Sequence, residues 1–460
     1  MFWCSRTPGI DHRTFIIDGD QSYSFNEIFK LSEEVVSDIP KRSVIVIESH
    51  RDLDTVCTYI GALRNGVVPL LVDANLKDEA VARIANSYQA EFVFGSGNRD
   101  LAGYESSGSA RGKSVYSRND KPGINVYEEL CLLLPTSGST GEAKCVRTSY
   151  DNLSQATQSI IRYLEMDESR VSISSLPLHY TYGLSVLNCA LESRSRFVLS
   201  DKSWLEREFW STVEKHAVTD LSGVPFMFQT LRRMRLSENI LKNLKCVNQA
   251  GGRLEPVLTE YFVNYFLAQD ISYFTMYGAT EASPRISYVP YHNSKEKVGT
   301  VGIPIDIGRL STDAADGVSE GELIYEGPNV CLGYGYNRED LTLGDENNQL
   351  LRTGDIGFID EDGYATIVGR KKRFVKVFGN SVNLDTIESM VRPVAGNSVA
   401  LGADDKVLVL ITEGDTQQIK NIILENVTFP SRGLKVNKVS EIYMNASGKP
   451  DYPRMNAEFL

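Results

Sequence analysis

A stretch rich in glycine and hydroxyl residues is the part of the chain best suited to hold phosphate. Three leucines at 132–134 lead into Thr136-Ser137-Gly138-Ser139-Thr140-Gly141-Glu142-Ala143-Lys144. Glycines let successive backbone N–H groups turn toward one anion, hydroxyl groups add donors, and the lysine supplies positive charge. Only two residues separate Gly141 from Lys144, which is not the spacing of the P-loop in nucleotide hydrolases. The stretch predicts a phosphate loop of another class, and a turn-rich linker is the alternative.

Later stretches of the chain give the loop a context. They are Tyr277-Gly278-Ala279-Thr280-Glu281, Gly321-Glu322-Leu323, Thr353-Gly354-Asp355, Gly369-Arg370-Lys371-Lys372 and Ser447-Gly448-Lys449. In this order the chain resembles the adenylate-forming superfamily, which includes acyl-CoA synthetases, luciferases and the adenylation domains of peptide synthetases. The resemblance covers most of the chain. It implies an acid–thiol ligase that uses ATP and Mg²⁺ to form an acyl-AMP with release of pyrophosphate.

The resemblance also assigns residues to the nucleotide. Those that would wrap the β- and γ-phosphates are Thr136, Ser137, Gly138, Ser139, Thr140, Gly141 and Lys144. Tyr277 would stack on adenine, with Gly252 and Gly278 also at the nucleotide, and the Thr280 hydroxyl would reach the α-phosphate. Glu281 would be a magnesium ligand, whereas a carboxylate at a helix start is otherwise simply solvated.

The same match assigns three further charged residues. Asp355 would accept hydrogen bonds from both ribose hydroxyls with Arg370 nearby, although an isolated aspartate there would more simply cap a turn. Lys449 would bridge the substrate carboxylate and the α-phosphate as charge develops in the transition state. Outside this motif, a lysine near a C-terminus is exposed and inert. The predicted catalytic residues are therefore Lys449, Glu281 and Thr280.

A second half-reaction is implied by residues 376–388. This segment resembles the part of the superfamily that forms the thiol-entry side after a small C-terminal domain rotates about a hinge, here Lys372. Gly379 would let a pantetheine arm approach closely, so the acyl group would pass to CoA or to the phosphopantetheine of a carrier protein. The alternative is an ordinary strand and helix start capped by Asn383 or Asp385.

The acyl pocket rests on resemblance alone. Its predicted lining includes Tyr180, Tyr182, Gly223, Val224 and Gly251, any of which could instead be core. No acidic residue stands where amino-acid-activating relatives place the aspartate for the α-ammonium group, which disfavours an α-amino acid.

Hydrophobic patterning predicts the elements that position these residues. Residues 44–47, 67–72 and 91–94 form short apolar runs, with helical periodicity at 53–63 and 79–87, which predicts a parallel sheet covered by helices. Residues 106–119, rich in Ser, Gly, Arg and Lys, predict a mobile surface loop. Residues 358–367 predict a hairpin that turns at Asp362-Gly363.

The predicted fold class is therefore α/β. The family resemblance implies a large N-terminal AMP-binding domain at 1–371 and a small C-terminal domain at 372–460. The first would combine helix-covered sheets with a small β-barrel-like region. The second would be a mobile α+β domain that carries the catalytic lysine.

Bulk properties exclude several classes. The chain has 460 residues, of which 42% are hydrophobic and 23% charged, and no apolar stretch long enough to cross a bilayer. A net charge of −12 argues against nucleic-acid binding. Seven cysteines without a Cys-x-x-Cys pair, and a start without a secretion signal, predict a reduced, cytoplasmic protein.

Three other readings stay open. The chain could activate amino acids or be a nucleotide-binding relative without turnover, although Glu281, Asp355 and Lys449 argue against the latter. An ATPase or kinase would need a different loop spacing and would release ADP. The identity of the acid, its acceptor and the oligomeric state are not predicted.

Overall fold

The computed structural model describes residues 12–120, 123–136, 144–234, 236–314, 319–378, 380–403, 405–427, 430–444 and 450–460. Contacts divide the chain into two units. The first comprises the described residues of Met1–Gly138, Glu142–Leu310 and Tyr325–Leu351. The second comprises those of Ser311–Ile324 and Arg352–Leu460. These contacts do not test the domain boundary predicted between residues 371 and 372, which stays a prediction.

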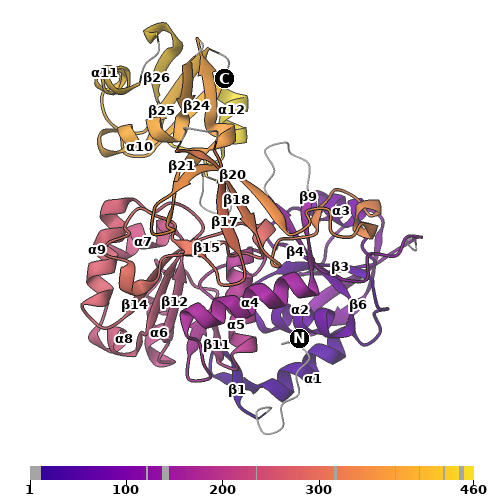
Figure 1. Ribbon diagram of the computed structural model, residues 1–460. Helices are drawn as coiled ribbons and strands as arrows, with labels where there is room; N and C mark the ends of the chain where they lie inside the picture. The colour runs from indigo at the N-terminus through magenta and orange to yellow at the C-terminus, as the bar shows by residue number, and fades with distance from the viewer. Residues whose placement is uncertain are drawn as a thin grey trace. The chain divides into compact units, whose positions relative to one another are not determined.

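Two large sheets build the first unit (Figure 1). Within the described residues, one sheet has nine strands, in the order β16 (Ile303–Pro304), β15 (Ser287–Tyr288), β14 (Ser272–Tyr277), β13 (Cys246–Gln249), β12 (Asp220–Gly223), β10 (Val171–Ile173), β11 (Arg196–Leu199), β1 (Thr14–Asp18) and β2 (Gln21–Ser24). In the same part of the chain the other has eight, in the order β19 (Gly333–Gly335), β9 (Lys144–Ser149), β8 (Leu130–Thr136), β4 (Val68–Asp73), β3 (Val44–Ser49), β5 (Phe92–Gly95), β7 (Lys113–Arg118) and β6 (Tyr104–Ala110).

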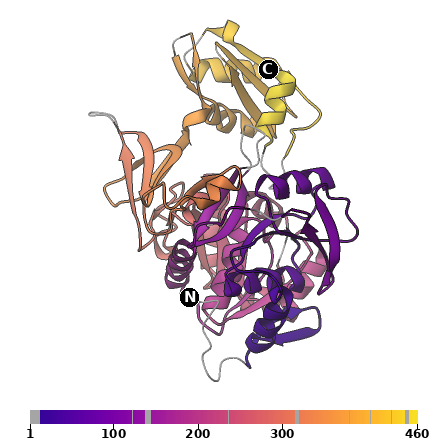
Figure 2. The same cartoon turned by 90° about the vertical axis from the view of Figure 1, so that its right-hand side faces the viewer.

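Helices cover these sheets. They are α1 (Phe25–Val36), α2 (Leu53–Asn65), α3 (Asp78–Ser87), α4 (Tyr150–Leu164), α5 (Thr181–Glu192), α6 (Arg207–Lys215), α7 (Pro225–Leu231), α8 (Glu238–Asn243) and α9 (Pro256–Leu267), with short 3₁₀ turns η1 (Thr280–Ala282), η2 (Tyr291–Asn293) and η3 (Glu339–Thr342). Figure 1 shows α6, α8 and α9 beside the sheet that contains β12 and β14. One apolar core joins residues of β1 and β3 with the inner faces of α1, α2 and α5. Segments far apart in sequence thereby meet, because β1 pairs in parallel with β11. Figure 2 shows indigo and magenta ribbons packed together within the first unit.

Local sequence signals set several helix ends. Ser24 and Glu27 form a capping box at the start of α1, and Ser149 and Asn152 form one at the start of α4. At the end of α2, Gly66 has φ of 70°, a left-handed conformation that glycine adopts without a Cβ clash. These signals lie within a few residues of each helix end, so the sequence alone contains them.

The predicted parallel sheet is confirmed. β3 pairs in parallel with both β4 and β5, and helices α2 and α3 connect these strands. The prediction of a surface loop at residues 106–119 is wrong. β6 and β7 form an antiparallel hairpin that extends the sheet from β5. Tyr116 is buried and Lys113 donates to the Glu48 carbonyl at 3.0 Å, so a few buried anchors hold a segment whose other side chains face water.

The second unit has smaller sheets. It holds most of a four-stranded sheet whose strands, within the described ranges, are β17 (Arg309–Asp313), β18 (Gly321–Glu326), β20 (Leu350–Ile359) and β21 (Ala365–Arg370). Its remaining described strands are β22 (Phe374–Val377), β23 (Asn380–Asn383), β24 (Ser398–Ala403), β25 (Lys406–Ile411) and β26 (Leu434–Lys438). Its described helices are η4 (Lys371–Arg373), α10 (Leu384–Ala395), α11 (Thr416–Asn426), η5 (Ser431–Gly433) and α12 (Tyr452–Phe459).

The hairpin predicted at residues 358–367 is confirmed. β20 and β21 pair antiparallel with Phe358 opposite Thr366, and Gly363 takes φ of 85° in the turn. This hairpin carries two of the predicted nucleotide residues, Asp355 and Arg370. Among the described residues, no helix is long and apolar enough to cross a membrane.

Candidate active site

A β-hairpin fixes both ends of the predicted phosphate loop. β8 and β9 pair antiparallel, and their register sets Thr136 opposite Lys144. Leu132 and Leu134 of β8 are buried, which anchors the hairpin in the core. Ser137, Gly138, Ser139, Thr140 and Gly141 lie outside the described residues, as does the side chain of Thr136. Their contact with phosphate stays a prediction.

Tyr334 joins the loop lysine to the predicted metal ligand. β19 pairs with β9 so that Tyr334 lies opposite Val146. The Lys144 Nζ lies 3.6 Å from the centroid of the Tyr334 ring, and the Tyr334 hydroxyl donates to Glu281 Oε1 at 2.5 Å. One phenol thus contacts a cation through its face and an anion through its hydroxyl.

The environment keeps this hydroxyl protonated. Burial raises the pKa of Tyr334, and the negative charge of Glu281 raises it further. The neighbouring backbone adds a second restraint, because the N–H of Cys331 donates to the Glu281 carbonyl at 2.8 Å. Tyr334 is not among the residues predicted from the sequence, since no spacing distinguishes Gly333-Tyr334-Gly335 from an ordinary short strand. Only the pairing of β19 with β9 brings it to the site.

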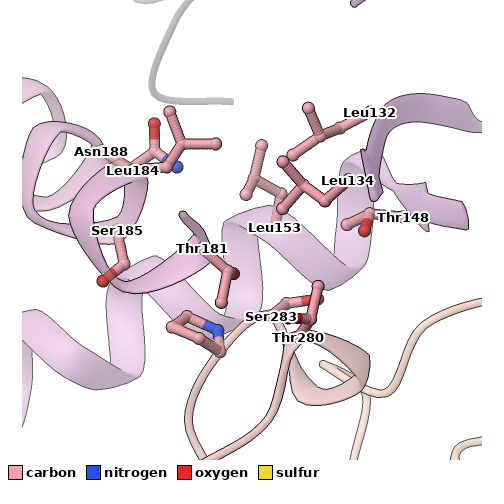
Figure 3. Close-up of a pocket in the computed structure, with 11 residues that line it drawn as sticks. Leu132, Leu134, Thr148, Leu153, Thr181, Leu184, Ser185, Asn188, Thr280 and Ser283 are labelled. Carbon is pink, nitrogen blue, oxygen red and sulfur yellow. The ribbon is translucent and has the colours of Figure 1, made fainter. Parts of the chain in front are cut away.

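Thr280 lines a small pocket beside this arrangement (Figure 3). The cavity has a volume of about 10 Å³, and side chains from β8, β9, α4, α5 and the η1 segment surround it. The Ser283 hydroxyl, also at this pocket, is buried and has no hydrogen-bond partner in the described part of the chain. The pocket therefore offers hydroxyl groups against a leucine-lined wall.

A glycine permits the tight turn that carries Thr280. A Cβ on Gly278 would lie 1.7 Å from the carbonyl oxygen of Pro284, so no larger residue fits without moving the backbone. Tyr277 ends β14 and pairs with Ser287 of β15. Tyr277 therefore lies at the end of β14, and Thr280 and Glu281 lie in the η1 turn that follows it.

Part of the predicted acyl pocket is also brought together. Tyr182 is buried and its hydroxyl donates to the Asn248 carbonyl at 3.1 Å, and burial raises its pKa. The ring of Tyr180 meets that of Tyr182 edge-on at 6.4 Å. A Cβ on Gly251 would lie 2.5 Å from the Tyr180 hydroxyl and 3.0 Å from Val224 Cγ1. Gly251 therefore leaves room for an aromatic wall.

Two other glycines of the prediction have different neighbours. Gly223 faces Trp204 and Phe228, where a Cβ would approach to 2.9 Å and 3.0 Å, so its smallness serves the apolar core. Gly252 is exposed and adjoins Pro225. Neither contact by itself indicates a ligand, and both assignments stay predictions.

In the second unit, the two residues predicted near ribose meet. Asp355 of β20 lies opposite Arg370 of β21, and Arg370 Nε lies 3.0 Å from Asp355 Oδ1. Asp355 is buried whereas the arginine is mostly exposed. The backbone N–H of Asp355 donates to Thr353 Oγ1 at 3.1 Å, which restrains the backbone where the pairing with β21 begins.

The predicted hinge and thiol segments are only partly described. Lys372 lies in η4, whereas Gly379 and Lys449 lie outside the described residues. Beside the hinge, Arg373 contacts Asp385 at 2.8 Å and Glu388 at 2.5 Å, and its guanidinium lies 4.1 Å from the centroid of the Tyr452 ring. Asn383 caps α10 as the alternative reading predicted. The roles of Lys372, Gly379 and Lys449 stay predictions.

Glu281 fits the way proteins bind magnesium with a nucleotide. Among the described residues, no group of three or more His, Cys, Asp or Glu side chains could hold a metal ion. Mg²⁺ bound with substrate phosphates needs only one or two protein carboxylates. One oxygen of Glu281 accepts from Tyr334, which orients the carboxylate as a second-shell donor does at a metal site.

Comparison with known proteins identifies the family. The model of the AMP-binding enzyme family matches residues 3–335. The chain therefore belongs to the AMP-binding enzymes, the adenylate-forming superfamily that the sequence resembles.

Individual members of the family are similar to this chain. The chain is 29% identical over 288 residues to a 2-succinylbenzoate–CoA ligase of Bacillus cereus (strain ATCC 10987 / NRS 248), a match that covers 61% of this chain and 58% of that protein. It is 23% identical over 444 residues to the 2-succinylbenzoate–CoA ligase of Staphylococcus epidermidis. This match covers 92% of this chain and 90% of that protein.

Solved structures share the fold. The o-succinylbenzoate CoA synthetase (MenE) of Bacillus subtilis, in complex with the acyl-adenylate OSB-AMP, superposes with a TM-score of 0.78 at 21% identity, covering 96% of this chain and 95% of that one. ATP-bound MatB of Rhodopseudomonas palustris superposes with a TM-score of 0.80 at 19% identity. The match covers 99% of this chain and 97% of that one. The α/β class predicted from the sequence is confirmed.

Proposed function

We propose that this AMP-binding enzyme is an ATP- and Mg²⁺-dependent acid–thiol ligase. It would join a carboxylic acid to AMP with release of pyrophosphate and then pass the acyl group to a thiol. The observation that carries the proposal is the contact of Tyr334 with both Lys144 and Glu281. A lysine for the departing phosphates and a carboxylate for Mg²⁺ are held by one side chain, beside the pocket that Thr280 lines.

Different residues would stabilise different charged groups of the reaction. The carboxylate oxygen of the substrate attacks the α-phosphorus, and the bond to the β,γ-pyrophosphate breaks. Lys144 would neutralise the departing pyrophosphate, and Glu281 would hold Mg²⁺, which offsets phosphate charge when bound. Thr280 would donate to the α-phosphate, and Lys449 would bridge it to the acid. Asp355, with Arg370 beside it, would select the ribose.

The acceptor is the finer part of the proposal. CoA is supported by the CoA ligases that the chain resembles, and a phosphopantetheine carrier is the alternative that the segment at 376–388 allows. We place the enzyme in the cytoplasm, a proposal that the buried free thiols of the six described cysteines support.

The test measures AMP and pyrophosphate from ATP and Mg²⁺ with a panel of fatty, aryl, dicarboxylic and amino acids. Hydroxylamine traps the adenylate, and CoA consumption reports the second step. Glu281→Gln serves as the control that removes the proposed metal ligand without changing side-chain volume. Acid-dependent AMP release that the variant loses supports the proposal. Release of ADP, or tight ATP binding with no turnover on any acid, contradicts it.

A further inference from the structure

Arg285 is a buried charge without a counter-ion among the described residues. It follows the turn that carries Thr280 and Glu281, and only 2% of it is exposed. Its Nε is buried and has no hydrogen-bond partner among the described residues. In the same part of the chain, no ion pair joins it to an acidic side chain. A guanidinium out of water is stable only where something else neutralises or solvates it.

The groups around Arg285 are aromatic or already engaged. Its guanidinium lies 5.2 Å from the centroid of the Tyr182 ring, and the Tyr163 hydroxyl is a further neighbour. Asp220 lines the same cavity, but its Oδ1 accepts from Arg170 at 2.8 Å and its Oδ2 accepts from the Thr219 hydroxyl. The nearby carboxylate therefore neutralises another arginine.

The cavity at Arg285 is small and contains two donors without partners among the described residues. Its volume is about 20 Å³, comparable to one or two water molecules. Ser172, which also lines it, has a buried hydroxyl without a partner in the described ranges, so two orphaned donors share one cavity. Met166 and Met276 supply apolar wall.

This cavity adjoins the predicted acyl pocket. Tyr182, assigned to that pocket from the sequence, lines it. Ser185 of α5 lines both this cavity and the pocket that holds Thr280. A substrate whose reacting carboxylate lies near Thr280 would have to pass Ser185, around the side of α5, to reach Arg285.

We propose that Arg285 is a specificity-determining residue that binds a second carboxylate, at the end of the substrate acid remote from the reacting one. This inference rests on the proposed function and narrows its substrate class to dicarboxylic acids. The carboxylate would accept hydrogen bonds from the guanidinium and from Ser172, filling both orphaned donors. A site built to bind such a group rejects an analogue that lacks it, because its buried donors are then left unpaired.

The experiment compares each dicarboxylic acid with its own monomethyl ester. Succinate, glutarate and isophthalate are assayed with their monoesters for AMP formation in the full-length enzyme, and kcat/KM gives the preference ratio. We expect the wild type to prefer at least one diacid over its ester by about 100-fold. Arg285→Gln should lower that ratio by about the same factor. Arg285→Lys, which keeps the charge but not the planar fork, should retain part of it.

The control is Arg162→Gln, an exposed arginine on α4 that pairs with Asp306 and should leave the ratio as in the wild type. Thermal unfolding checks that each variant folds, and the rise in melting temperature with isophthalate, without ATP, reports binding directly. Turnover of monoesters equal to that of diacids in the wild type would overturn this inference while sustaining the proposed function. Absence of AMP release with every acid would instead count against the proposed function. In that case, a rise in melting temperature with isophthalate that is lost in Arg285→Gln would still support the anion site.

Discussion

Arg285 in the first unit is buried and Arg373 in the second is half-buried, and both pack over a tyrosine ring, yet their surroundings differ. Arg373 has two carboxylates, Asp385 and Glu388, within 2.8 Å and a backbone carbonyl acceptor. Arg285 has no described carboxylate partner. Arg373 is neutralised by the protein itself, as a structural ion pair requires, whereas no acidic side chain among the described residues neutralises Arg285.

A similar contrast separates the residues around Tyr452 from those around Tyr334. The Tyr452 hydroxyl donates to Glu388 at 3.0 Å, and that carboxylate also accepts from the Ala400 N–H and from Arg373. Glu281 accepts only one described side-chain hydrogen bond, from Tyr334. A carboxylate with three donors around it helps to hold the fold together, whereas one with a single donor keeps more lone pairs for a ligand.

The largest expected effect is on stability. Arg373→Met should lower the free energy of unfolding of the second unit by about 3–5 kcal/mol, because it leaves Glu388 buried without its cation. Arg285→Met should change the stability of the first unit by less than about 1 kcal/mol, since no described carboxylate loses a partner. Urea unfolding followed by circular dichroism measures both. Equal losses in the two variants would break the distinction between the arginines.

The distinction between charges that stabilise the fold and charges that act on a ligand can also be tested at Lys449. Lys449→Ala should slow adenylate formation by about 100- to 1,000-fold and leave ATP binding nearly intact, because it removes a contact made in the transition state. Single-turnover formation of the trapped adenylate gives the rate, and equilibrium titration with ATP gives the affinity. Adenylation as fast as in the wild type would remove Lys449 from the catalytic set.

Tyr334 should have an intermediate effect. Tyr334→Phe keeps the ring under Lys144 but removes the hydrogen bond to Glu281, which is worth about 1.5–3 kcal/mol when one partner is charged. We expect about a tenfold or greater rise in the Mg²⁺ concentration needed for half-maximal rate. Tyr336→Phe, at a half-exposed neighbour, is the matched control. A purely structural role would instead lower the melting temperature and leave the Mg²⁺ dependence as it was.

The smallest effect concerns pH. Burial alone would raise the pKa of Glu322, but hydrogen bonds from Lys371, Arg352 and the Gly354 N–H outweigh it and lower the pKa. Because the folded-state pKa is below the unfolded value, this stabilisation is present above the unfolded pKa and is lost as pH falls through the folded one. Glu322→Gln should therefore flatten the acid limb of the stability profile below about pH 4.5. An unchanged acid limb would show that this carboxylate is not coupled to folding.

Much of the scaffold follows from local sequence. The apolar runs at 44–47 and 67–72 and the helical periodicity between them predict β3, α2 and β4, because burial with period 2 or 3.6 is a local property. The same reasoning fails at residues 106–119. Their polar composition is that of an edge hairpin with one wet face, and only the long-range pairing with β5 distinguishes it from a loop.

The sequence by itself determined the family, through the order of its motifs, and the candidate residues Lys144, Thr280, Glu281, Asp355 and Arg370. Tertiary structure alone decided which charges have partners. Tyr334 reaches Glu281 across 53 positions of sequence, and Asp220 pairs with Arg170 rather than with Arg285. Charge compensation depends on distances of a few ångströms between strands far apart in the chain, and no local pattern of residue types encodes those distances.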